Sequence, residues 1–76
     1  MATKAEEAKA GCWAKAADDE PVFVLRATDM MAPAAIRAWA AYAAAAGTPA
    51  AKVKRATDTA AEMEAWQQKH GKKVAD

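Results

Sequence analysis

The chain has very few of the residues that build catalytic and metal sites. It contains no serine, one histidine (His70) and one cysteine (Cys12). Nucleophilic catalysis needs a nucleophile, a base that activates it and a group that orients the base, and structural zinc needs four cysteine or histidine ligands. The three glycines lie far apart, so neither a phosphate loop nor a dinucleotide-binding pattern is present. We therefore expect a protein that is not an enzyme and that holds no metal or cofactor.

Disulfides and long apolar runs are also missing. A single cysteine cannot form an internal disulfide, whereas small secreted domains usually depend on several. No stretch approaches the roughly 20 apolar residues that a membrane-spanning helix needs. The first twenty residues hold no continuous apolar run of the kind found in signal peptides. We therefore expect a cytoplasmic protein.

The chain is rich in alanine. The 76 residues are 54% hydrophobic with a net charge of +1, but an alanine buries only a methyl group, so bulky apolar side chains are few. A domain of this size buries only about 60% of the surface of its unfolded chain. We expect one small domain that is marginally stable or stabilised by association. A net charge near zero also argues against a protein whose main task is to coat nucleic acid.

Two helices are predicted, over 33–46 and 49–70. Pro33 suits the first helical position, and Gly47 and Gly71 provide the two stops. Because only a few residues connect the helices, the pair should form an antiparallel hairpin. The apolar stripes that should form its core are Ile36, Trp39, Ala40 and Ala43 on the first helix and Val53, Ala56, Ala60, Met63 and Trp66 on the second. Tyr42 falls off its stripe and is expected to make a solvent-exposed contact.

The first twenty residues are predicted to be a mobile or partly helical arm. Thr3 followed by Glu6 fits a capping box, which predicts a short helix ending near Gly11. The main domain should cover 21–71, and 72–76 should be a loose basic tail. The expected fold is therefore mainly α: a two-helix hairpin, one short extended apolar segment and the arm.

The extended segment is the run Val22, Phe23, Val24 and Leu25. Its continuous apolar, β-branched and aromatic composition predicts a strand that is buried on both faces and covers the hairpin. The sequence has no second run of this kind, and buried backbone groups need partners. These partners could come from the N-terminal segment, from the same segment of a second copy in a homodimer, or from the sheet edge of another protein.

The stretch DEPVFVLRATD at 19–29 resembles a family of short proteins encoded by phages, prophages and bacterial genomes. The resemblance covers roughly 12–76, and its further matches are Ala32, Pro33, Trp39, Ala40, Lys52, Val53, Met63, Trp66 and the ending HGKKVAD at 70–76. It brings no active-site motif. It implies a small accessory protein that docks on a larger host or phage machine, a class that includes inhibitors of host defence such as anti-CRISPR proteins.

The leading hypothesis is accordingly a protein-binding module that acts by docking on a larger protein. The residues expected to bind the partner are the acidic run and residues near the turn between the extended segment and the first helix: Asp18, Asp19, Glu20, Arg26, Asp29, Met30, Met31 and Arg37. The acidic members could also mimic nucleic-acid phosphates. The alternative is a small helix-turn-helix-like DNA-binding protein that uses the basic first turns of the last helix, with Lys52, Lys54 and Arg55.

Overall fold

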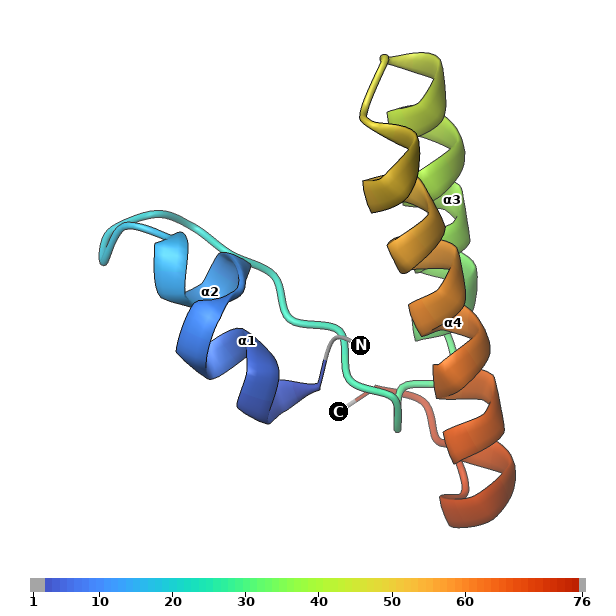
Figure 1. Cartoon of the computed structure of the whole chain (residues 1–76). Helices are drawn as coiled ribbons and strands as arrows, with labels where there is room; N and C mark the ends of the chain where they lie inside the picture. The colour runs from blue at the N-terminus through green and yellow to red at the C-terminus, as the bar shows by residue number, and fades with distance from the viewer. Residues whose placement is uncertain (1–2, 76) are drawn as a thin grey trace.

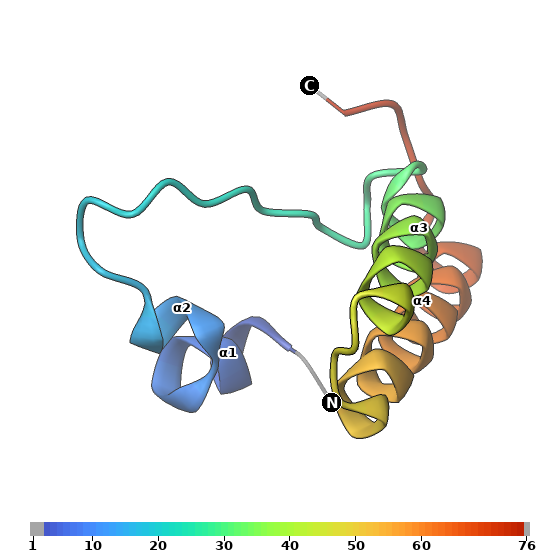
Figure 2. The same cartoon turned by 90° about the horizontal axis from the view of Figure 1, so that it is seen from above.

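The computed structural model describes residues 3–75, so expectations that concern residues 1, 2 and 76 lie outside the described residues. The chain is mainly helical, with α1 (Lys4–Ala10), α2 (Cys12–Lys15), α3 (Ala32–Ala45) and α4 (Ala50–His70). The long helices α3 and α4 lie side by side, while α1 and α2 contact each other and stand away from them (Figure 1). Seen from above, an irregular segment joins the two pairs (Figure 2). No helix within residues 3–75 combines the length and apolar character needed to cross a membrane.

The predicted stop at Gly47 is confirmed, and α3 ends in a Schellman motif. Gly47 has a φ of 90°, a conformation that side-chain-bearing residues rarely adopt. Its N–H donates to the carbonyl of Ala44 at 3.2 Å, and the N–H of Thr48 donates to that of Ala43 at 2.9 Å. These bonds satisfy carbonyls at the helix end and turn the chain within four residues towards α4. The boundaries of both long helices lie within one residue of the prediction.

Alanine dominates the buried residues of α3 and α4, with Pro33 and Gln67 buried beside it. Ala32, Ala40, Ala43 and Ala60 are the buried hydrophobic core, between 0% and 7% exposed. Among the described residues no large side chain is fully buried. Small side chains let two helices approach closely, but each methyl group contributes little hydrophobic free energy. The packing of this pair is therefore close and its apolar core is small.

The prediction that Trp39 and Trp66 form part of the core is wrong. Their exposed fractions are 45% and 39%, because helices that meet through alanine leave no space for an indole ring between them. Both rings lie at the edge of the apolar stripe, while Ile36 and Met63 are half-buried. Alanine methyl groups are therefore buried, whereas the two indole rings are partly exposed to solvent.

The C-terminal tail returns to the turn that precedes α3. The N–H of Lys73 donates to the carbonyl of Thr28, and the N–H of Met30 donates to the carbonyl of Lys73, both at 2.9 Å. Together they form an isolated parallel bridge between Asp29 and Lys73. The prediction of a loose tail over 72–76 is therefore wrong at Lys73, because the turn offers backbone groups that the tail can pair with.

Gln67 holds the same turn from the side of α4. Its side chain is 8% exposed, and its amide Nε2 donates to the carbonyls of Ala27 and Asp29 at 2.9 and 3.1 Å. Both N–H groups of one amide are therefore used on backbone acceptors of the turn. This amide and the Lys73 bridge fix the position at which the chain enters α3.

The apolar segment is not buried, contrary to prediction. Val22, Phe23 and Val24 are 51%, 87% and 63% exposed, and only Leu25 is half-buried. The described residues contain no strand that could pair with this segment. It runs irregularly between the arm and α3 (Figure 2).

The arm, for which the sequence leaves a mobile or a partly helical state open, contains the helices α1 and α2. The hydroxyl of Thr3 accepts from the N–H of Glu6 at 3.3 Å, and the carboxylate of Glu6 accepts from the N–H of Thr3 at 2.9 Å. This is the expected capping box, and Gly11 ends the helix. The N–H of Cys12, at the start of the short helix α2, donates to the carboxylate of Glu7 at 2.9 Å.

Candidate interaction surfaces

The side chains that catalysis or metal binding would use are not grouped within residues 3–75. Within residues 3–75, no group of three or more histidine, cysteine, aspartate or glutamate side chains is placed to hold a metal ion. Cys12 is exposed on α2. His70 lies at the end of α4 against the ring of Trp66, with centroids 4.4 Å apart.

Asp29, expected to bind a partner, is used within the fold. Its carboxylate Oδ1 accepts from the N–H of Met31 at 2.9 Å, which forms an Asx turn at the entry to α3. Met30 and Met31 are exposed beside it, and Arg26 is exposed at the start of the turn. The turn therefore presents two flexible methionines and one cation to solvent, while Asp29 keeps the turn in shape.

Arg37 is also engaged inside the chain. Its two terminal nitrogens donate to the two carboxylate oxygens of Glu64 at 2.8 and 2.7 Å. This bidentate hydrogen bond raises the pKa of Arg37 and lowers that of Glu64. The pair borders a shallow, open depression of about 520 Å³ that is also lined by Met30, Pro33, Ala34, Gln67, Gln68 and Lys72. Since the guanidinium is already paired, Arg37 is not a ready contact for a partner.

The acidic run lies on the arm and apart from this turn. Asp18, Asp19 and Glu20 are exposed in the bend that follows α2. The carboxylate of Glu20 accepts from the N–H of Ala17 at 3.3 Å, whereas no ion pair within residues 3–75 engages Asp18 or Asp19. The structure thus does not bring the acidic run together with Arg26 and the methionines.

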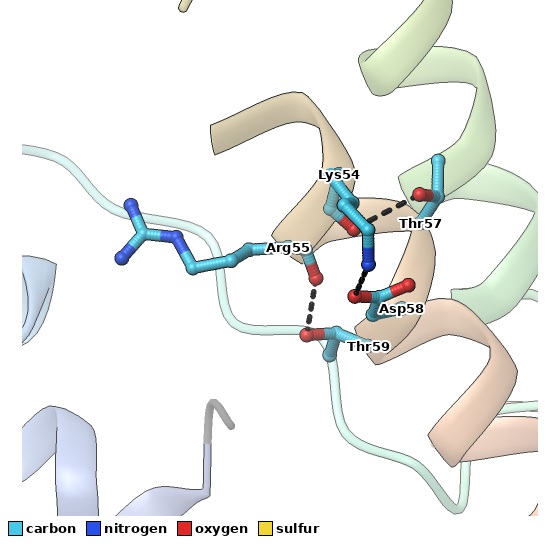
Figure 3. A network of polar contacts seen from close by, with 5 residues as sticks. All are labelled: Lys54, Arg55, Thr57, Asp58 and Thr59. Carbon is cyan, nitrogen blue, oxygen red and sulfur yellow. Dashed lines mark hydrogen bonds and ion pairs between the residues drawn. The ribbon is translucent and has the colours of Figure 1, made fainter. Parts of the chain in front are cut away.

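The basic trio proposed for DNA does not form one surface. The ammonium of Lys54 lies 2.8 Å from the carboxylate of Asp58, and this contact raises the pKa of Lys54. Arg55 extends away from that pair (Figure 3). Neither Lys52 nor Arg55 has an ion-pair partner in the described part of the chain. The trio therefore divides into one neutralised lysine and two available cations.

One flank of the helix pair carries both exposed aromatic rings and cations. Trp39 follows Arg37 by two residues, and Trp66 follows Glu64 by two residues. Two residues turn a helix by about 200°, so both indoles lie on the side opposite to the Arg37–Glu64 pair. Tyr42, which is 79% exposed, lies about 140° around α3 from Arg37 by the same count.

The cations of α4 share this flank with Trp66. Positions 52, 55, 59, 62, 66 and 69 recur at alternating spacings of three and four, so they form one stripe along the helix. The stripe carries Lys52, Arg55 and Lys69 against a single acid, Glu62. We call the surface made by Trp39, Tyr42, Lys52, Arg55 and Trp66 the aromatic flank. The signal was available in the spacing, but the assumption that both tryptophans were buried concealed it.

Three surfaces therefore distinguish this chain: the exposed apolar segment 22–25, the turn with its two methionines, and the aromatic flank. The first two are continuous along the chain, and the third lies on the helix pair. Comparisons with protein families, with curated proteins and with solved structures find no match to this chain.

Proposed function

We propose that this chain is a non-enzymatic protein-binding module that docks on a larger protein through the apolar segment 22–25. The observation that carries the proposal is the exposure of this segment, with Phe23 at 87% beside the two exposed valines. Neighbouring apolar side chains that remain exposed together usually mark an interaction site. In this proposal α3 and α4 form an antiparallel hairpin that serves as the scaffold.

The backbone N–H and carbonyl groups of the segment are available for hydrogen bonds to a partner, as its side chains are for apolar contacts. Among the hydrogen bonds of residues 3–75, none uses an N–H or carbonyl of residues 21–25. An extended peptide with free backbone groups and alternating apolar side chains can add a strand to the exposed sheet edge of another protein. Main-chain hydrogen bonds would then supply affinity, and pockets for Phe23 and its neighbours would supply specificity.

The turn gives this segment a fixed root. Gln67 and Lys73 hold residues 27–30 by hydrogen bonds, so the segment leaves the scaffold at a defined point. Met30 and Met31 are exposed next to that root, and flexible methionine side chains adapt to partner surfaces. Arg26 adds a cation at the same place. Together they extend the proposed contact beyond the four apolar residues.

The consequence of docking would be steric occlusion. The resemblance to phage-associated proteins favours a cytoplasmic inhibitor or accessory subunit of host or phage machinery. A chain of 76 residues with no catalytic constellation among its sequence motifs can act on a large protein by covering one of its surfaces.

Matched valine substitutions test the proposal. Val24→Asp puts a charge into the segment, and Val74→Asp makes the same change at another exposed valine. Tagged wild-type and variant chains are incubated with lysate of the encoding organism, with and without nuclease treatment, and the captured proteins are identified by mass spectrometry. We expect Val24→Asp to lose a large protein that both wild type and Val74→Asp retain. Equal capture by all three chains would contradict the proposal, and so would capture that disappears entirely after nuclease treatment.

A further inference from the structure

We propose that the aromatic flank binds single-stranded nucleic acid, with bases stacked on its exposed rings and phosphates paired with its cations. The strand is bound through chemistry that DNA and RNA share, without regard to base sequence. The proposal uses a different surface from the segment 22–25 and does not rest on the larger protein partner. It also differs from the helix-turn-helix hypothesis, because Lys54, which that hypothesis needs, lies off the flank and is paired with Asp58.

The flank carries three aromatic rings that the fold leaves exposed. Tyr42 is 79% exposed, Trp39 45% and Trp66 39%. The bidentate contact between Arg37 and Glu64 brings these two residues to one level of the helix pair. Each tryptophan follows one of them by two positions, so the two indoles lie at similar heights on the other side. Tyr42 follows Trp39 by less than one helical turn, and the flank thus presents closely spaced rings of the kind on which bases stack.

The cations on this side of α4 are available to an anionic ligand. Lys69 continues the stripe of Lys52 and Arg55 beyond Trp66. No ion pair within residues 3–75 engages Lys52, Arg55 or Lys69. Figure 3 shows the guanidinium of Arg55 extended away from α4. Because the stripe carries these three cations and only one acid, Glu62, it is positive overall and complementary to a phosphate backbone.

The length of the stripe suits a strand of several nucleotides. From Lys52 to Lys69 it rises by about 26 Å, at about 1.5 Å per residue. A stacked strand advances about 3.4 Å per nucleotide, so this length accommodates about seven nucleotides. Along α4 the ring of Trp66 lies between Arg55 and Lys69. A strand that follows the stripe would therefore meet cations on both sides of the aromatic rings.

The combination of rings and cations favours nucleic acid over an acidic protein segment. Carboxylates can pair with lysine and arginine, but they offer no flat apolar face to the rings. Every base has a π-face, and stacking on aromatic side chains strengthens binding whatever the base. The acidic residues of the arm, Asp18 and Asp19, form no ion pair within residues 3–75. The arm helices make no close contact with α3 or α4 and stand away from them in both views (Figures 1 and 2).

Fluorescence anisotropy with labelled single strands tests the proposal. An oligothymidylate and an oligouridylate, each of about 15 nucleotides, are titrated with the full chain at several salt concentrations. The two strands should bind alike, because stacking and phosphate contacts are common to both. With three phosphate contacts, the affinity should fall about 20-fold between roughly 50 and 200 mM salt.

Matched variants separate the cations from the rings. Lys52→Gln combined with Arg55→Gln leaves one contact, so the fall over the same salt range should shrink to about threefold. Tyr42→Leu should weaken binding about fivefold or more through the loss of one stacked base. Lys9→Gln combined with Lys54→Gln removes the same formal charge away from the flank and should bind as wild type does.

Several results would overturn the inference and leave the proposed function standing. They are a wild type that binds neither strand at low salt, flank variants that bind as well as wild type, and equal binding of a duplex, whose bases cannot reach the rings. Displacement of the strand by poly-glutamate at equal charge would favour an acidic protein instead. A strand bound only after Asp18→Asn and Asp19→Asn would show that the arm of the same chain covers the flank. Circular dichroism of each variant shows that the helices are retained.

Discussion

Replacing Gln67 with alanine tests whether one buried amide holds the root of the apolar segment. The amide donates to the carbonyls of Ala27 and Asp29 at 2.9 and 3.1 Å, and these acceptors lie 40 and 38 residues away along the chain. Alanine removes both donors and leaves the helical backbone of α4 unchanged. The turn would keep the Lys73 bridge but lose its attachment to the helix.

The expected loss of stability follows from two hydrogen bonds. Each contributes about 1 kcal/mol net to folding, so Gln67→Ala should lower the free energy of unfolding by about 2 kcal/mol. For a domain of about 60–100 residues, 1 kcal/mol corresponds to roughly 4–8 °C in Tm. We therefore expect Tm to fall by about 8–16 °C.

The neighbouring glutamine provides the control. Gln68 is exposed on the same helix, and Gln68→Ala makes the same gain in helix propensity without removing a bond to the turn. Thermal unfolding is followed by circular dichroism at the helix band for both variants and wild type. Equal Tm values for the two variants would refute the role assigned to Gln67.

Three other substitutions test the helix pair. Ala60→Leu overpacks a position that is 0% exposed; it should cost about 1–3 kcal/mol, and an unchanged urea midpoint would contradict close packing there. Gly47→Ala meets no atom within 4 Å but needs a φ of 90°; it should cost about 1–2 kcal/mol from the backbone alone, measured in the same titration. Glu64→Gln should lower Tm at neutral pH. Arg37 lowers the pKa of Glu64 in the folded chain, so the stabilisation is present above the unfolded pKa and is lost as pH falls through the folded pKa. The two Tm curves should meet in acid, and a constant separation would refute the pairing.

The helices could be predicted because their signals are local. Gly47 and Gly71 each adopt a positive φ at a helix end, and Thr3 with Glu6 completes a capping box within one turn. Such signals depend on residues only three or four positions apart, so a single sequence contains them in full.

Which apolar residues are buried could not be predicted fully, because the spacing of apolar residues along a helix does not give the distance to the neighbouring helix. The periodicity correctly includes Ala40, Ala43 and Ala60 in the buried faces. It cannot show that contact through alanine brings the helices too close together for Trp39 and Trp66 to enter. The apolar period of a helix describes direction around its axis, whereas burial depends on the partner at that position.

The contacts that define the candidate surfaces are long-range and polar. Arg37 meets Glu64 across 27 residues, and Gln67 reaches Ala27 across 40. No local pattern distinguishes a glutamine that caps a distant turn from one that faces solvent. Asp29 and Arg37 were therefore expected at a partner surface, although the fold uses both of them internally.

An alanine interface determines where the rest of the apolar surface lies. If large side chains filled the space between α3 and α4, the helices would lie further apart and the aromatic rings would be buried in the core. Because methyl groups fill that space, Trp39 and Trp66 are displaced to the outside. The apolar segment 22–25 is exposed as well. The close packing that holds this small chain together is thus also the physical reason that its largest apolar side chains remain available to another molecule.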